Sequence, residues 1–220
     1  LLHMEQDDPY EKTLPKISNF IIEICSLYLG LTIVCALLYY FFGMSGFDAI
    51  AHSMTTISTG GFSPHSSSIG FFDSSSIETI SIIFMIVGSL PFVVYLKFIH
   101  GERLSIIKDD QIKLFTLIIF LLIGLTTLWL QKNSLHEDLF LSFRLSAFNI
   151  TSILTGTGYT STNYNTWGSF GLVIMIIIMF IGGCAGSTTG GIKIFRLQLL
   201  FRGAKTQIKK LTQPHGVFLT

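Results

Sequence analysis

The chain has 220 residues, of which 50% are hydrophobic and only 12% are charged, and its formal net charge is +1. A soluble domain of this length carries about a quarter charged residues, so the composition excludes an ordinary water-soluble globular protein. The apolar residues gather in long runs, which makes lipid the expected solvent. We therefore expect an all-α integral membrane protein.

The first apolar run is Ile17–Phe42, whose one charged residue is Glu23. At about 1.5 Å per residue it is long enough to cross roughly 30 Å of hydrocarbon. The next segment, Phe47–Ser58, would form a helix only about 18 Å long, which is too short to cross. Asp48 near its start is typical of a helix N-terminus. The pattern predicts a span followed by a half-helix that ends inside the membrane.

A string of hydroxyls and glycines, Ser58–Phe62 ("STGGF"), follows the half-helix. It must return to the surface as non-helical backbone, which persists at membrane depth only where protein buries it or it lines a water-filled cavity. Its carbonyl and hydroxyl oxygens can line the path of a dehydrated cation. The alternative is that these small residues only pack helices together in lipid. A second apolar run, Ile77–Ile99, is expected to span with a kink at Pro91.

The same order of segments then returns. After the polar link come a span, a shorter segment and a second glycine string ("TGTGY"), at Leu114–Leu130, Leu139–Leu154 and Thr155–Tyr159. Gly61 and Gly158 are 97 residues apart and occupy matching places in the two strings. Two equal units of this kind indicate an internal repeat. The repeat favours the cation-lining interpretation over simple helix packing.

The last apolar run, Phe170–Ile181, is broken by Gly182–Gly191 ("GGCAGSTTGG"). Ten residues with five glycines and three hydroxyl side chains make a poor helix, so we expect a discontinuous span whose freed carbonyls face a cavity. A glycine-rich helix-packing face is one alternative. A phosphate-binding loop is disfavoured, because Ile192 interrupts the GxxxxGK[ST] pattern before Lys193.

Basic residues mark one side of the membrane. Of the 14 lysines and arginines, 12 lie before the first span, between the second and third spans, or after the last apolar run. The positive-inside rule assigns these regions to the cytoplasm. The expected organisation is a cytoplasmic segment 1–16, a membrane-pore-membrane repeat 17–99, a cytoplasmic link 100–113, a second such repeat 114–201 that contains an intramembrane loop 182–191, and a basic cytoplasmic tail 202–220.

Four polar residues within the apolar segments invite specific expectations. Arg144 either tunes the electric field of the pore, pairs with Glu137 or Asp138, or snorkels to the headgroups, and snorkelling is the favoured interpretation. Glu78 is expected at the membrane interface. His52 and Asn149 stand nine residues before Gly61 and Gly158, the matching glycines of the two strings. We expect them to hold the strings by hydrogen bonds rather than to act as ligands.

The strings "STGGF", "TGTGY" and "GGCAGSTTGGIKIFR" (Gly182–Arg196), set in span–pore-helix–span repeats, resemble the Trk/Ktr/HKT superfamily of potassium transporters. The third string is most similar to its bacterial Trk/Ktr branch. The resemblance implies four repeats around one pore, of which this chain holds counterparts of the second and third. Gly156 departs from the pattern, because relatives often have threonine there.

The resemblance also implies which residues form the site. The filter residues are Ser58, Thr59, Gly60, Gly61 and Phe62 in the first string, and Thr155, Gly156, Thr157, Gly158 and Tyr159 in the second. The gate is the intramembrane loop of Gly182, Gly183, Cys184, Ala185, Gly186, Ser187, Thr188, Thr189, Gly190 and Gly191. Main-chain carbonyls of the filter residues would coordinate K⁺.

The implied function is potassium uptake across the bacterial plasma (inner) membrane by a multi-pass protein that is not an enzyme. K⁺ is the transported ion, and no covalently bound cofactor is expected. Implied partners are membrane lipid, the remaining pore repeats, and a homodimeric assembly with a cytosolic nucleotide-binding regulatory subunit; no nucleic acid is expected. The alternative is a non-transporting fragment or assembly subunit that needs partner repeats to complete a pore. A membrane enzyme or organic-solute transporter is disfavoured, because the spans lack the buried carboxylates and histidines of such sites.

Overall fold

A computed structural model describes residues 9–133 and 138–212. The regular elements of these residues are helices, and one isolated parallel bridge joins Ile181 to Ile192. The α-helices are α1 (Pro9–Phe41), α2 (Gly46–Ile57), α3 (Ser75–Ser89), α4 (Phe92–Ile99), α5 (Ser105–Lys108), α6 (Asp110–Lys132), α7 (Leu139–Leu154), α8 (Gly168–Met179) and α9 (Ile194–Thr212). Two short 3₁₀ helices, Ser68–Phe72 and Tyr164–Trp167, precede α3 and α8. The all-α expectation is confirmed.

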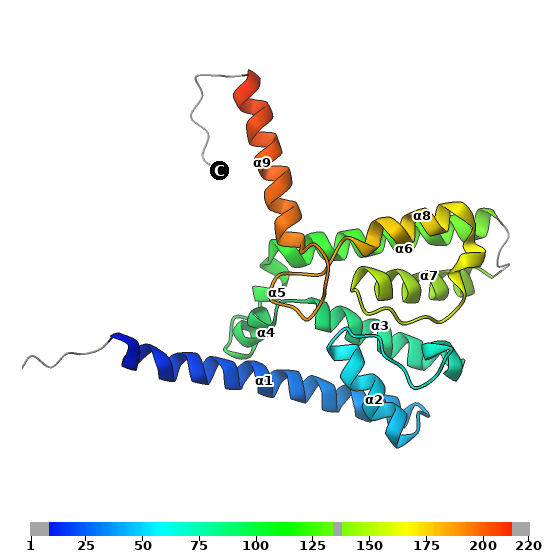
Figure 1. Ribbon diagram of the computed structural model, residues 1–220, viewed down its shortest axis with the longest axis horizontal. Coiled ribbons are helices and arrows are strands. Elements are labelled where there is room, and N and C mark those ends of the chain that lie inside the picture. Colours follow the sequence, from blue (N-terminus) through cyan, green and yellow to red (C-terminus); the bar gives the residue numbers. More distant parts are fainter. Residues whose placement is uncertain (1–8, 134–137, 213–220) are drawn as a thin grey trace, which may run out of the picture.

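Two helices are long and apolar enough to cross a membrane, over Ile17–Phe41 of α1 and Asp110–Lys132 of α6. They correspond to the first and third predicted spans. Figure 1 shows α1 and α6 along opposite edges of the body, with α2, α3 and α7 between them. The helix α6 begins four residues earlier than predicted, because the Asp109 carboxylate caps it by accepting hydrogen bonds from the amides of Gln111 and Ile112.

The two predicted half-helices are present as α2 and α7. Their bounds agree with the predicted segments to within one residue. Each packs against the first span of its own unit, α2 on α1 and α7 on α6. Two apolar clusters form the core, one mainly in each unit, and each takes in residues of the other unit, such as Val94 in the second cluster and Phe148 in the first. The repeat is therefore structural as well as sequential.

The predicted single span Ile77–Ile99 is corrected by the structure. It consists of two helices, α3 and α4, that meet at an angle of 91°. The break falls at Pro91, as predicted, but it is a turn rather than a kink. Leu90 is extended there, and Pro91 has no amide hydrogen to continue the helix. The carbonyls that this break frees are used elsewhere, as described below.

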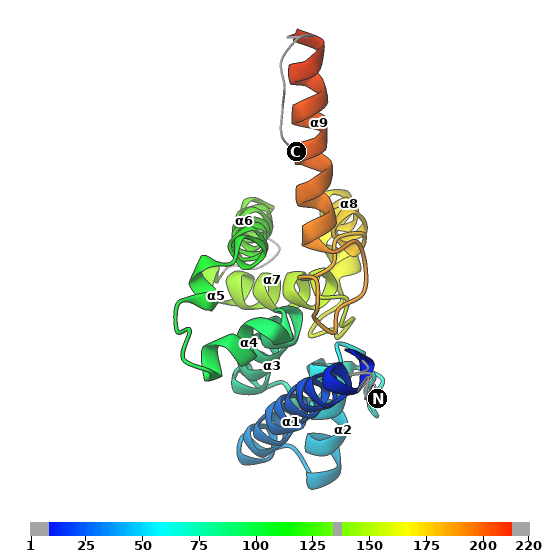
Figure 2. The same cartoon turned by 90° about the vertical axis from the view of Figure 1, so that its left-hand side faces the viewer.

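The second break is wider than the first. After α8 the chain forms a non-helical loop and then α9, so the predicted interruption over Gly182–Gly191 is confirmed. The helix α9 does not resume the direction of α8 but leaves the body crosswise to it and to α6 (Figures 1 and 2). It is also continuous through residues 201 and 202, where the sequence predicted a boundary between repeat and tail. The last eight residues of that tail lie outside the described residues.

Candidate functional site

Both half-helices begin at a side-chain cap and end at a glycine string. The Ser45 hydroxyl accepts a hydrogen bond from the amide of Asp48 at the start of α2, and the Asp138 carboxylate accepts one from the amide of Phe140 at the start of α7. A hydrogen bond from the Ser45 hydroxyl lowers the pKa of the Asp48 carboxyl at the mouth of the first unit. The opposite, electronegative end of each helix dipole then points at a string.

The backbone turns in the same way in both strings. Thr59 and Gly61 have φ of 50° and 68°, and their counterparts 97 residues later, Gly156 and Gly158, have φ of 71° and 86°. Glycine adopts this left-handed region freely, whereas a β-branched residue does so with strain. The glycine at position 156 therefore removes a strain that Thr59 carries in the first string.

Several carbonyl oxygens of the strings are uncommitted. Those of Gly60, Gly61, Gly156, Thr157 and Gly158 accept no hydrogen bond from any described residue. The glycines 60, 156 and 158 are exposed, and Gly61 is partly so. Exposed carbonyls in non-helical backbone are suitable ligands for a dehydrated cation.

The outermost carbonyls of the strings behave differently. The carbonyl of Phe62 accepts a hydrogen bond of 2.9 Å from the Thr55 hydroxyl, and that of Tyr159 accepts one of 2.7 Å from the Ser152 hydroxyl. Thr55 and Ser152 are again 97 residues apart. Sequence reasoning missed this pair of hydroxyls, although the repeat period could have found them.

The predicted hydrogen-bonding role of His52 and Asn149 is confirmed, and both side chains are fully buried. The Nδ1 of His52 donates to the carbonyl of Asp48 and its Nε2 accepts from the Ser63 hydroxyl at 2.9 Å. The Nδ2 of Asn149 lies 3.0 Å from the Ser161 hydroxyl. Each of these side chains joins its half-helix to the residues that follow the glycine string.

The two strings also touch each other. The buried Tyr159 hydroxyl donates to the carbonyl of His52 at 3.0 Å, so the second string is tied to the first half-helix. A Cβ placed on Gly61 would lie 1.8 Å from the carbonyl oxygen of Thr157. Glycine is the only residue that this approach admits without a shift of backbone.

The loop of residues 182–191 is docked on the first unit. The amides of Cys184 and Thr188 donate to the carbonyls of Ser89 and Gly88, which the break in α3 leaves free, and the amide of Phe92 donates to the carbonyl of Gly186. The two helix breaks thus supply hydrogen-bond partners for each other's free amides and carbonyls. Such groups need partners where no water reaches them.

The side chain of Thr188 connects the loop to the end of α2 and to the first string. Its hydroxyl lies 2.9 Å from the carbonyl of Ile57, at the end of α2, and 3.0 Å from that of Gly88. The Thr59 hydroxyl is 3.4 Å away. The loop also has an anchor on the other side, where Gln111 accepts from the amide of Ala185 at 2.9 Å. Just after the loop, Lys193 donates to the carbonyl and hydroxyl of Thr189.

The expectations for Arg144 and Glu78 were wrong. Glu78 is 3% exposed rather than interfacial, and its Oε2 lies 3.0 Å from the Nε of Arg144. This ion pair joins α3 of the first unit to α7 of the second. Asp138 caps α7 instead, and Glu137 lies outside the described residues. The pair is 66 residues apart in sequence, so no local pattern indicates it.

The oxygens that the strings bring together are carbonyls and threonine hydroxyls. In the described part of the chain, no three His, Cys, Asp or Glu side chains come together as metal ligands. Neutral oxygens of this kind are suitable ligands for a dehydrated cation, and the hydrogen-bonded loop of residues 182–191 packs against the strings. The fold is that of a helical membrane protein built from two repeats.

The chain belongs to the TrkH family of cation transport proteins, whose model matches residues 2–219. It is 36% identical over 221 residues to the Trk system potassium uptake protein TrkI of Halomonas elongata, covering 100% of this chain and 44% of that protein. It is 35% identical to the Trk system potassium uptake protein TrkH of Escherichia coli K12, covering 94% and 43%. The crystal structure of the potassium transporter TrkH from Vibrio parahaemolyticus superposes with a TM-score of 0.89 at 35% identity, covering 94% and 45%. The chain thus spans less than half the length of these relatives.

Proposed function

We propose that this chain forms two of the repeats of a potassium uptake pore in the bacterial inner membrane. Its family, together with relatives that are potassium uptake proteins, supports K⁺ as the transported ion. The function needs no bond to be made or broken, so the chain acts as a transporter rather than an enzyme. The observation that carries the proposal is the matched set of uncommitted carbonyls in two strings 97 residues apart.

Within the filter, the carbonyls of Gly60, Gly61, Gly156, Thr157 and Gly158 would replace part of the hydration shell of K⁺. Thr59 and the hydroxyls of Ser58 and Thr155 would complete the lining below them. The carbonyls of Phe62 and Tyr159 already accept hydroxyl hydrogen bonds, so these residues would set the shape of the filter. Fixed ligand positions let a filter favour one ion over another.

The loop Gly182–Gly191 would act as a gate. Its contact with the second string supports this role, since the backbone of Gly190 is within 4 Å of a Cβ placed on Gly156. Ions could pass only when the loop gives up its hydrogen bonds to Gly88, Ser89 and Ile57. Each such bond contributes about 1 kcal/mol, so the closed position is stable yet reversible.

The pore would be completed outside this chain. Two repeats supply half of a four-part ring, and the remaining repeats would come from a longer polypeptide or another chain. In this chain the two repeats would be residues 17–99 and 114–201, and residues 100–113 would join them on the cytoplasmic side. A homodimer with a cytosolic nucleotide-binding regulatory subunit would contact the cytoplasmic faces of residues 101–111 and 203–213.

A chimera tests this proposal. The matching segment of the E. coli TrkH would be replaced by this chain in a strain that lacks potassium uptake. We expect growth at low external K⁺. No growth, with the chimera present in the membrane at the level of the parent, would contradict the proposal.

A further inference from the structure

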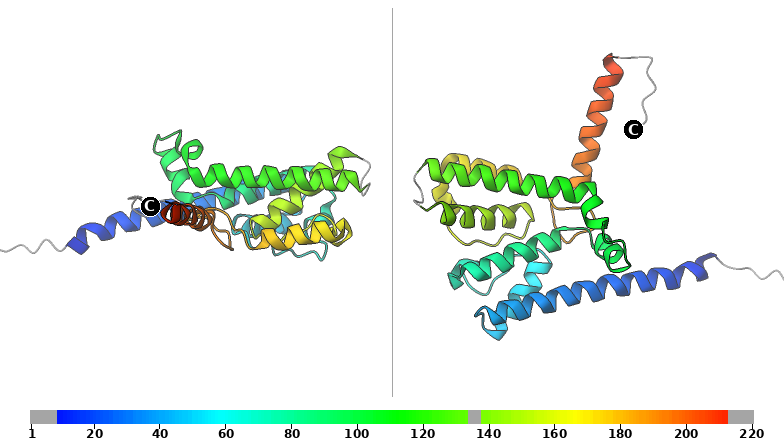
Figure 3. Two further views of the ribbon diagram at one scale, coloured as in Figure 1. Left: turned by 90° about the horizontal axis from the view of Figure 1, so that it is seen from above. Right: turned by 180° about the vertical axis from the view of Figure 1, so that it is seen from behind.

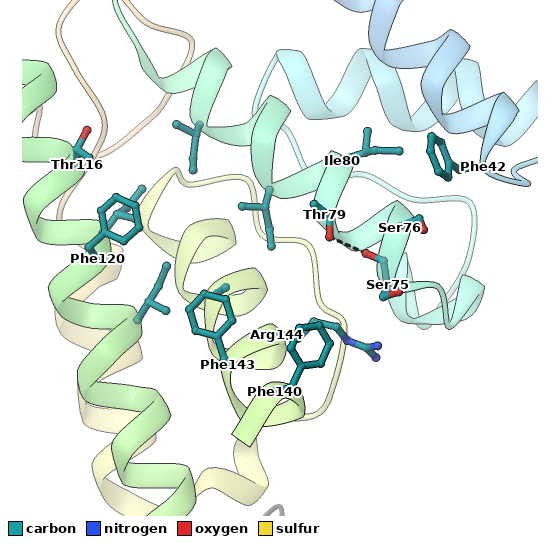
Figure 4. Close-up of a pocket in the computed structure, with 15 residues that line it drawn as sticks. Phe42, Ser75, Ser76, Thr79, Ile80, Thr116, Phe120, Phe140, Phe143 and Arg144 are labelled. Atoms are coloured by element: carbon teal, nitrogen blue, oxygen red, sulfur yellow. Dashed lines mark hydrogen bonds between the residues drawn. The ribbon is translucent and has the colours of Figure 1, made fainter. Parts of the chain in front are cut away.

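A long apolar groove runs between the two units, and none of the residues that line it belongs to a glycine string. It has a volume of about 730 Å³, and its walls come from α3 on one side and α6 and α7 on the other. Figure 4 shows Phe120, Phe140 and Phe143 along this space, with Ser75, Ser76 and Arg144 toward one end and Thr116 at the other. Both walls belong to this chain.

The groove has the length of one bilayer leaflet. Along α3 it extends from Ser75 to Ile86, about 16 Å of helix, and the hydrocarbon core of a bilayer is roughly 30 Å thick. On the predicted topology the Ser75 end faces outward. A lipid tail that entered from the outer leaflet would therefore run the length of the groove without crossing the midplane.

The outer end of the groove is polar. The hydroxyl residues Ser75, Ser76 and Thr79 line it together with Arg144. Arg144 touches Glu78 only through Nε, and its two terminal nitrogens form no hydrogen bond with any described residue. Its side chain is 24% exposed, whereas that of Glu78 is 4% exposed. Arg144 is thus the more exposed partner and the one that lines the groove, with donors to spare for a phosphate.

Negative charge is present at the same end. The Glu78 carboxylate lies behind Arg144, and Asp73, two residues before Ser75, is close enough to act on Glu78 electrostatically. An end that holds both signs of charge matches a zwitterionic headgroup better than an anionic one.

We propose that this groove binds one glycerophospholipid with an amine-bearing headgroup of the phosphatidylethanolamine type. One acyl chain lies between Phe120, Phe143 and Ile82, the phosphate contacts Arg144 and the hydroxyls of Ser75 and Ser76, and the amine faces the exposed carboxylate of Asp73. The lipid would fill the seam between the two filter-bearing units and so hold their spacing.

The test uses the chain purified in mild detergent and mixed with phosphatidylethanolamine and phosphatidylglycerol of equal chain length. Native mass spectrometry then reports the lipid bound. We expect one lipid per chain, with the ethanolamine lipid preferred. Thr79→Trp places a ring in the groove and should lower retention by about tenfold. Ile83→Trp, on the same helix at a 51% exposed position outside the groove, is the matched control.

Two further variants keep the test decisive. Ala147→Leu fills the groove from the opposite wall, in case Thr79→Trp alters folding, and it should also release the lipid. Arg144→Lys keeps the charge beside Glu78 but removes the forked donors, so retention should fall about threefold. Equal retention by the filled-groove variants and Ile83→Trp, or a preference for phosphatidylglycerol, would overturn the proposal.

Discussion

The two glycine strings reach the same backbone turns from different residues. The first uses Thr59, His52 and Thr55 where the second uses Gly156, Asn149 and Ser152. Both strings contain backbone in the left-handed region. In both, a buried side chain of the half-helix contacts a serine just after the string, and a hydroxyl donates a hydrogen bond to the last carbonyl of the string. The comparison teaches that carbonyl positions are held in common, while the side chains that hold them vary.

The two units differ much more where their second helical run is broken. In the first unit two residues, Leu90 and Pro91, separate α3 from α4, whereas in the second unit 14 residues separate α8 from α9. The longer break docks on the shorter one through the carbonyls of Gly88 and Ser89. Each break therefore supplies hydrogen-bond partners for the backbone of the other.

The largest effect should come from Gly61→Ala, which breaks the equivalence of the strings. At Gly61 a Cβ meets the Thr157 carbonyl oxygen at 1.8 Å and the φ is left-handed, whereas at Gly158 the φ is left-handed but nothing lies within 4 Å. Gly158→Ala should cost about 1–2 kcal/mol of stability, and Gly61→Ala more. Thermal unfolding of the two variants in detergent checks this. Equal losses would show that the strings do not touch.

The next effect concerns the contact between the units. Glu78→Gln or Arg144→Met removes one partner of a largely buried ion pair, and each should lower the free energy of unfolding by about 3 kcal/mol. The double variant should be less destabilised than the sum of the two. A double-mutant cycle by denaturant unfolding measures this coupling. Additive losses would mean that the two side chains do not interact.

A smaller stability effect, but a functional one, is expected for Thr188→Val. This change keeps the shape of the side chain and removes the hydroxyl beside the carbonyls of Ile57 and Gly88. We expect a loss of about 1 kcal/mol and a higher basal K⁺ flux through a chimera, because the closed loop is weakened. Thr79→Val is the control, since the Thr79 hydroxyl bonds only within its own helix. Unchanged flux would argue against the loop as a gate.

The smallest effect should distinguish the two hydroxyls on the outer carbonyls. Ser152→Ala removes one hydrogen bond, to Tyr159, and should cost about 1 kcal/mol. Thr55→Val should cost more, because the Thr55 hydroxyl also contacts that of Tyr159. Unfolding midpoints of both variants, together with K⁺ over Na⁺ selectivity, compare them. A greater loss of stability in Ser152→Ala than in Thr55→Val would contradict the expected order.

Local patterns in the sequence predicted the elements well. The lengths of the apolar runs and the positions of the glycine strings gave α2 and α7 to within a residue, and Pro91 marked the first break. The 91° bend was not predictable, because proline fixes where a helix stops but the docked loop fixes where the chain goes next. The direction of α9 was missed for a similar reason: Gln198 contacts the carbonyl of Asp110, 88 residues away.

The candidate site was predictable where it rests on the repeat. His52 and Asn149 were found by their equal spacing to the glycines, and Thr55 and Ser152 could have been found in the same way. The Glu78–Arg144 pair breaks the repeat, since only one partner comes from each unit and neither has a charged counterpart 97 residues away. Such contacts depend on how the units pack, which spacing does not reveal.

The central claim is that the glycine strings form the filter, and matched glycine substitutions test it most directly. Gly158 and Gly168 both have left-handed φ and open space around them, but only Gly158 lies in a string. ⁸⁶Rb⁺ and ²²Na⁺ uptake would be measured in vesicles with chimeras carrying Gly158→Ser or Gly168→Ser. We predict that Gly158→Ser loses rubidium selectivity while Gly168→Ser retains it. Equal selectivity in both variants would contradict the assignment of the strings as the filter.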